Sequence, residues 1–166
     1  MDQRINELIS VMREQVKIID LFRELGESKT PALVKGRYEE LERIIKVEEL
    51  LIVEMGHLER QRVEGSQEIA QLLQIPVEEI SISRLQSEFA GCSEELESIK
   101  DQLLVGSREL GELNQLNNEL IEQSLRHLDF TVQLLTETES GGGYSQRDRD
   151  AVISPQETAR IFDRWA

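Results

Sequence analysis

The spacing of apolar residues constrains this chain more than any other feature. Over most of its 166 residues they recur at steps of three and four, and the three prolines stand far apart, at Pro31, Pro76 and Pro155. Such steps keep apolar side chains on one face of a helix, and the long proline-free stretches leave room for very long helices. We therefore predict an all-α fold, an antiparallel bundle of three to four long helices with a flexible C-terminal tail.

The first helix is predicted from Ile5 to Leu25, with two interpretations of its end. Gly26 could stop it, with Thr30 capping a new helix. Alternatively, one helix continues to about Val34 with a kink near Pro31. The pattern leaves both open. A short polar turn at residues 35–37 then predicts an antiparallel second helix.

A second helix is predicted from Tyr38 to Leu73, ending before Pro76 because the residue that precedes proline disfavours the helical region. The third and longest helix is predicted over residues 84–137, capped by Ser81 or Ser83. We expect a bend or break at Gly106 or Gly111, because glycine is a poor helix former.

Three glycines at positions 141–143 are expected to stop the third helix. The predicted organisation is therefore a long-helix bundle over residues 1–139, followed over residues 140–166 by a glycine-rich linker and a tail. Ser154 with Glu157 matches the spacing of a capping box, which predicts a short helix near residues 155–165.

The balance of charge excludes several functions. Nineteen Lys and Arg face thirty-three Asp and Glu, a net charge of −14, whereas sequence-independent nucleic-acid binding relies on basic residues. No apolar run approaches the roughly 18 residues of a membrane span, and the N-terminus lacks the pattern of a signal peptide. We expect no nucleic-acid partner, no membrane insertion and a cytoplasmic location.

The sequence shows no catalytic or metal-binding constellation. His57 and His127 are far apart, and neither has a second ligand at helical spacing. Cys92 falls in an apolar row among acidic residues, which disfavours a reactive thiolate. Phosphate-binding and dinucleotide-binding glycine motifs are absent. We therefore predict that the protein is not an enzyme and needs no cofactor or metal.

The third predicted helix is too long for the first two to cover, so one end of it should lack a partner within the chain. Its far half carries apolar residues on more than one stripe, and an exposed patch of that kind usually marks a partner site. These residues are Leu120, Ile121, Leu125, Leu128, Phe130, Val132, Leu134 and Leu135. The alternative is that they form the core of a homodimer, in which case the chain would be a structural or adaptor coiled-coil protein.

Several segments together resemble the FlgN-like flagellar export chaperones, the chaperones of the hook-associated proteins at the hook–filament junction. The resemblance covers roughly residues 5–145. It is carried by the leading Leu/Ile row, by residues 32–36 before a Leu-rich second helix, and by residues 48–51 and 58–62 within that helix. The most specific piece is Leu-Asn-Gln-Leu-Asn-Asn-Glu-Leu-Ile at residues 113–121.

The resemblance implies a cytoplasmic type III export chaperone that takes part in building the bacterial flagellum. Such a chaperone binds the amphipathic terminal segments of hook-associated proteins, prevents their premature association and delivers them to the export apparatus. Carried over by position, it assigns client binding to Leu120, Ile121, Leu125, Leu128, Val132 and Leu135. It assigns contact with the export apparatus to Tyr144.

Overall fold

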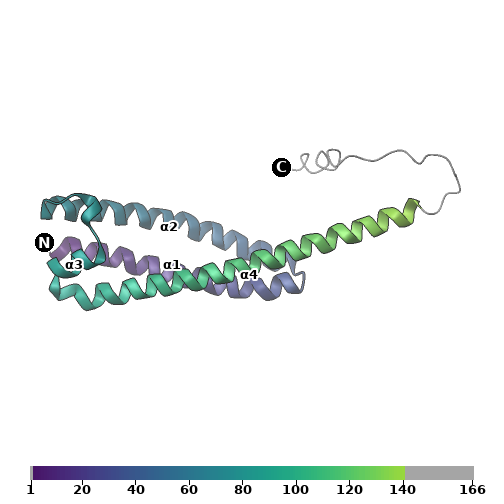
Figure 1. Cartoon of the computed structure of the whole chain (residues 1–166), viewed down its shortest axis with the longest axis horizontal. Helices are drawn as coiled ribbons and strands as arrows, with labels where there is room; N and C mark the ends of the chain where they lie inside the picture. Colours follow the sequence, from purple (N-terminus) through teal and green to yellow (C-terminus); the bar gives the residue numbers. More distant parts are fainter. Residues whose placement is uncertain (1, 141–166) are drawn as a thin grey trace. The chain divides into compact units, whose positions relative to one another are not determined.

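The computed structural model describes the backbone of residues 2–140 and the side chains of residues 3–136. Within that range the chain forms four α-helices and two short 3-10 helices, with no strand, which confirms the all-α prediction (Figure 1). In chain order they are α1 (Asp2–Val34), α2 (Tyr38–Leu73), η1 (Val77–Glu79), α3 (Ile82–Glu88), η2 (Ala90–Cys92) and α4 (Ser93–Ser140).

Residues 1–126 group into one compact unit, and a second unit begins at His127. The predicted tail, with its capping box and with Ile161, Phe162 and Trp165, lies outside the described residues.

Helix α1 is continuous and contains Pro31, so the interpretation of a single helix to Val34 is the correct one. Gly26 does not stop it, because Gly26 packs against α4 rather than turning the chain. The helix ends at Val34 and is followed by Gly36, whose φ of 61° is the left-handed conformation that glycine adopts easily. The following amide, that of Arg37, donates to the carbonyl oxygen of Ala32 at 2.9 Å.

Helix α2 has the predicted bounds and runs antiparallel to α1. Lys29 of α1 pairs with Glu48, and Gln15 donates to Glu59, so residue numbers fall along α2 as they rise along α1. The helix ends at Gln74, whose φ of 56° is left-handed and whose amide donates to the last carbonyl groups. Pro76 follows, and the chain cannot continue the helix through it.

The predicted third helix is wrong at its start, because the structure divides it into α3, η2 and α4. Ser81 caps α3, accepting from the amide of Arg84 at 3.1 Å. The helix stops at Phe89, which has a φ of −124° and is buried together with Leu85. The break lets both side chains enter the core, and burial of two large apolar groups outweighs the lost helical hydrogen bonds.

Beyond this break α4 continues to Ser140. The break expected at Gly106 or Gly111 is not observed, since the helix continues through both residues. The main hydrophobic cluster joins the start of α1, the end of α2, α3 and the start of α4. Its buried members are Ile5, Leu8, Ile9, Met12, Ile69, Leu85, Phe89, Leu96 and Ile99.

Candidate partner-binding surface

Helices α1 and α4 lie side by side and run parallel, with a nearly constant register. Ile19 is nearest to Gly106, Gly26 to Leu113, and Thr30 to Asn117. The differences are 106 − 19 = 87, 113 − 26 = 87 and 117 − 30 = 87. Parallel helices in register keep such an offset, because both rise by the same distance per residue. The end of α1 at Val34 is therefore level with position 34 + 87 = 121 on α4.

Two glycines permit this close approach. A methyl group added to Gly106 would lie 2.8 Å from Cγ2 of Ile19, and one added to Gly26 would lie 2.6 Å from Cδ2 of Leu113. Both distances are well inside van der Waals contact. Gly106 of α4 thus accommodates Ile19 of α1, and Gly26 of α1 accommodates Leu113 of α4.

Charged residues line the edge of the same seam. Arg13 forms an ion pair with Glu95, and the guanidinium of Arg23 donates to Glu109 at 3.0 Å. The hydrogen bond to Glu109 raises the pKa of Arg23 above its ordinary value. Exposed pairs of this kind contribute about 0.2–1 kcal/mol each, so the apolar contacts and the glycines decide how the two helices pack.

Asn117 lies in this seam as a buried polar residue, with 2% of its surface exposed. Its Nδ2 donates to the carbonyl oxygen of Gly26 at 2.9 Å, and its Oδ1 accepts from the hydroxyl of Thr30 at 2.8 Å. The sequence spacing places Asn117 in the apolar row of α4, four residues after Leu113 and four before Ile121, but it does not reveal these bonds. A polar residue in an otherwise apolar row was the available signal.

The apolar row of α4 that packs on α1, which includes Leu110 and Leu113, becomes exposed after Asn117. In the first unit Leu120 is half-buried, whereas Ile121 and Leu125 are 38% and 55% exposed. In the second unit the other three predicted client-binding residues, Leu128, Val132 and Leu135, are 49–62% exposed. All six predicted residues therefore belong to one continuous helix, and five of them are exposed. Tyr144 lies outside the described residues.

A second exposed apolar area, which the sequence did not single out, lies on the middle of α2. Leu50, Ile52 and Val53 are exposed, although they stand within a run of apolar residues. Leu51, inside the same run, is half-buried. The spacing already indicated their exposure, because Leu50, Ile52 and Val53 lie outside the apolar stripe that helical periodicity assigns to α2.

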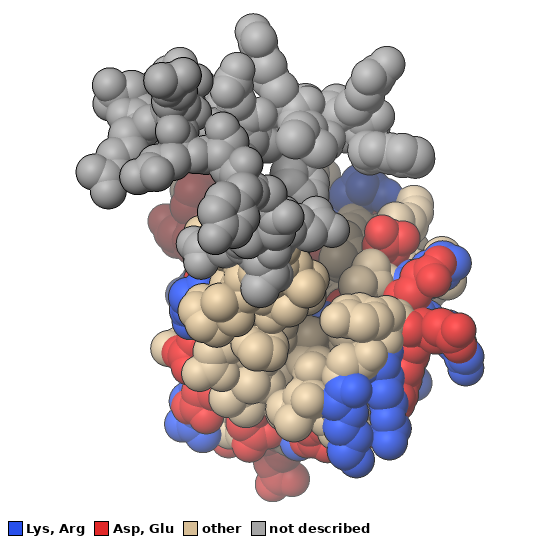
Figure 2. Space-filling view, turned by 90° about the vertical axis from the view of Figure 1, so that its right-hand side faces the viewer, with Lys and Arg blue, Asp and Glu red and all other residues tan. Residues whose placement is uncertain are grey.

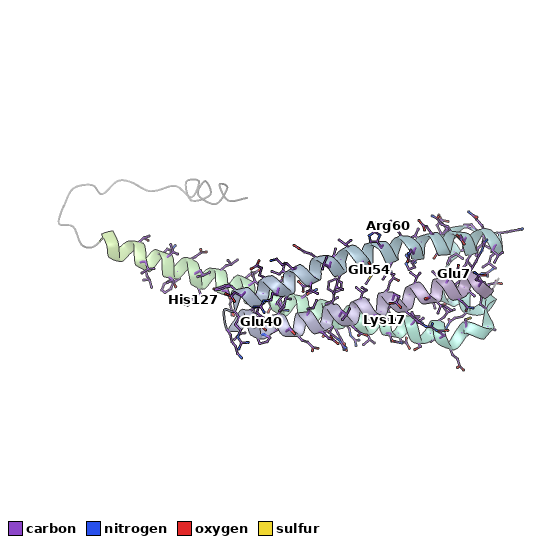
Figure 3. The ribbon with its side chains drawn as sticks, turned by 180° about the vertical axis from the view of Figure 1, so that it is seen from behind. Glu7, Lys17, Glu40, Glu54, Arg60 and His127 are labelled. Atoms are coloured by element: carbon purple, nitrogen blue, oxygen red, sulfur yellow. The ribbon has the colours of Figure 1, made fainter. Side chains whose placement is uncertain are left out.

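On the face seen in Figure 2, Lys and Arg lie next to Asp and Glu around its margins, and uncharged residues occupy its centre. Side chains such as Lys17 on α1 and Glu54 and Arg60 on α2 are labelled in Figure 3. A mixed surface of this kind favours solubility and does not form the basic stripe of a nucleic-acid site.

The two histidines show no catalytic arrangement. His57 is exposed, and its Nδ1 lies 2.5 Å from the guanidinium of Arg60. His127 is exposed as well. Cys92 is partly buried against the hydrophobic cluster. Among residues 2–140 no three potential ligands gather as a metal site would require. The described helices also include none with the length and hydropathy of a membrane span.

Comparison with known proteins gives one family. The family model described as FlgN protein matches residues 1–150. No curated protein and no solved structure is similar enough to count as a match. The match covers nearly all of the 166 residues, including α1, α2 and all of α4. The chain therefore belongs to the FlgN family, the family of flagellar export chaperones.

Proposed function

We propose that the protein is a cytoplasmic chaperone that binds the amphipathic terminal segments of hook-associated proteins. Binding prevents their premature association, and the chaperone delivers them to the flagellar export apparatus. The client-binding residues are those predicted from the sequence, all of them on α4: Leu120, Ile121, Leu125, Leu128, Val132 and Leu135. Tyr144 contacts the export apparatus.

One observation carries this proposal: α1 ends level with Ile121 while α4 continues to Ser140. Up to Asn117 the apolar row of α4 is covered by α1, and from Ile121 onward its residues are exposed. An amphipathic client helix can cover such residues as α1 covers the earlier ones, by packing its apolar face along α4.

The expected strength of binding follows from the exposed area. Burying a Leu, Ile or Val side chain completely contributes about 1.5–3 kcal/mol. Because Ile121, Leu125, Leu128 and Val132 are about half exposed, covering all four contributes on the order of 3–6 kcal/mol. A client that folds on binding loses conformational entropy, which offsets part of this gain. The complex is therefore held by a modest free energy and can be released.

The proposal is tested with a purified terminal segment of a hook-associated protein from the same genome as the probe. Its affinity is measured by isothermal titration calorimetry for the full chain and for Leu125→Asp. We expect the substitution to weaken binding at least tenfold, because a carboxylate must be desolvated where a leucine was buried. Helicity measured by circular dichroism should stay unchanged, since Leu125 is exposed.

The matched control is Leu104→Asp, which places the same charge on α4 at a residue that is 61% exposed and outside the proposed site. It should bind the probe like the wild type. Equal affinity in Leu125→Asp and the wild type, or an equal loss in both variants, would contradict the assignment. An obligate dimer by light scattering that ignores the probe and dissociates in Leu125→Asp would instead support the adaptor alternative.

The export-apparatus contact is tested separately with Tyr144→Ala. If Tyr144 acts in delivery, this variant should bind the probe with unchanged affinity while secretion of hook-associated proteins falls in cells. Unchanged secretion would remove Tyr144 from the proposal without affecting the client-binding residues.

A further inference from the structure

Asn117 is the one fully buried asparagine of the described residues, and it occupies a position that an apolar residue would fill in a simpler helix pair. Three functional groups meet there: its side-chain amide, the hydroxyl of Thr30 and the carbonyl oxygen of Gly26. The Thr30 hydroxyl also lies 3.2 Å from that carbonyl oxygen. Both polar atoms of the buried amide are thus satisfied by α1 alone.

Such an arrangement tolerates one register between two helices. In a coiled-coil seam an isolated buried asparagine is known to specify register at a cost in stability, because a shift separates it from its partner. Here a shift by one heptad would leave the amide of Asn117 without Thr30 and Gly26. The buried amide would then lose its hydrogen bonds without gaining water.

The glycine contacts oppose the same shift. In the observed register Gly106 accommodates Ile19, and Gly26 accommodates Leu113. If α4 moved so that the offset became 87 + 7 = 94, the large side chains of Leu113 and Ile19 would meet each other. Gly26 would then face Leu120 and Gly106 would face Met12, so the steric cost of the shift comes from placing Leu113 against Ile19. The observed register is therefore held by the hydrogen bonds of Asn117 and by the separation of these two side chains.

The register also decides which apolar residues remain exposed. With an offset of 87 the last residue of α1, Val34, is level with Ile121. With an offset of 94 the end of α1 would extend over Ile121 and Leu125 and cover part of the surface assigned to the client. One heptad is about 10 Å along a helix, a large part of the available length.

We propose that Asn117 is a positioning residue that fixes the register of α1 on α4 through Thr30 and Gly26, and thereby makes Ile121 the first exposed residue of the apolar row that α1 covers up to Asn117. The assignment of register rests on the contacts above. Its consequence for binding rests on the proposed function.

The test measures the register directly in the full chain. Spin labels are placed at two exposed residues, Glu7 on α1 and Ser107 on α4, in a Cys92→Ser background. Position 7 + 87 = 94 is level with Glu7, so Ser107 lies 107 − 94 = 13 residues further, about 20 Å along the axis. A slip of one heptad changes this axial separation by about 10 Å, which electron–electron distance measurement resolves.

We expect Asn117→Leu to remain helical, to show a second distance about 10 Å from the first, and to bind the probe of the preceding section at least fivefold more weakly. Asn118→Leu is the matched control for the distance, because Asn118 is exposed; it should keep the single distance. If Asn117→Leu does not fold, Thr30→Val takes its place, since it removes the hydroxyl and preserves the size of the side chain.

A single unchanged distance in the variant would overturn the register role. A shifted distance with unchanged probe affinity would overturn its consequence for binding. Failure of the wild-type chain to bind the probe would refute the proposed function, while the distances would still decide whether Asn117 sets the register.

Discussion

Two glycines of α4 provide a sharp test of how this helix packs. Gly106 is buried against Ile19, whereas nothing lies within 4 Å of the methyl group that a substitution would add to Gly111. In both positions Gly→Ala gains about 0.8–1 kcal/mol of helix propensity. Only at Gly106 must the added methyl group displace a neighbour. The difference between the two variants therefore isolates the steric cost of the α1–α4 contact.

That cost can be estimated from the geometry. The new Cβ at position 106 would lie 2.8 Å from Cγ2 of Ile19. A β-branched side chain on a helix has one strongly preferred rotamer, so Ile19 cannot turn aside freely. Overpacking a methyl group into such a site costs about 1–3 kcal/mol. We expect Gly111→Ala to be more stable than the wild type, and Gly106→Ala to be about 1–3 kcal/mol less stable than Gly111→Ala.

The assay is urea unfolding followed by circular dichroism at 222 nm, with the free energy of unfolding obtained by linear extrapolation. In a chain of this length each kcal/mol corresponds to about 2–4 °C in melting temperature, which gives an independent measure. Combining Gly106→Ala with Ile19→Ala should remove most of the steric term, because the two residues are in contact. If Gly106→Ala is as stabilising as Gly111→Ala, Ile19 does not pack on Gly106 and the offset of 87 is incorrect.

Further predictions concern ion pairs, pH and the tail. The pair between Lys29 and Glu48, at 2.6 Å with side chains 15% and 17% exposed, should be the ion pair most sensitive to removal of one partner. Lys29→Met should cost roughly 1–3 kcal/mol in urea unfolding because it leaves the Glu48 carboxylate poorly solvated, and the exposed Lys46→Met should cost under about 0.5 kcal/mol; equal losses would contradict this ranking. The hydrogen bond from Arg62 lowers the pKa of Glu59 below its ordinary value, so Glu59 contributes stability that is present above its unfolded pKa and is lost as the pH falls through the folded one. Glu59→Gln should accordingly be less stable than the wild type near pH 7 and lose this deficit near pH 3, and a deficit that is independent of pH would rule out the linkage. Deleting residues 141–166 should leave the helicity and the unfolding midpoint unchanged, because the main hydrophobic cluster is built from residues 5–99; a cooperative loss of helix would show that the tail belongs to the core.

Some elements could be predicted because local signals agree. Tyr38 and Leu73 bound α2 as expected, since a glycine turn precedes it and Pro76 follows it. For α1 the local signals conflicted: Gly26 and Pro31 both disfavour a helix, yet α1 passes through both. At Gly26 the close contact with Leu113 of α4 outweighs the low helix propensity. An apolar pattern read along one chain segment does not contain that contact.

Tertiary contacts also explain why the start of the third predicted helix was wrong. Leu85, Phe89 and Leu96 fit a continuous heptad row, but the chain breaks at Phe89 so that all three become buried. Conversely, Gly106 was expected to bend or break α4, but the helix continues through it and Gly106 packs closely on Ile19. In both cases the deciding energy comes from residues distant in sequence, which periodicity alone does not identify.

The exposed apolar residues of the candidate site result from a difference in length between α1 and α4. The row of α4 does not change in character at Asn117: Leu110 and Leu113 precede it, and Ile121 and Leu125 follow at the same three- and four-residue steps. What changes is the presence of α1, which ends at Val34 while α4 has 140 − 121 = 19 further residues. The first part of the row is therefore covered within the chain, and the second is the part that we propose a client covers. If both parts use the same packing geometry, a client helix reproduces the apolar face that α1 presents to α4, where Ile19 packs on Gly106. This predicts clients whose terminal segments carry apolar residues at three- and four-residue steps.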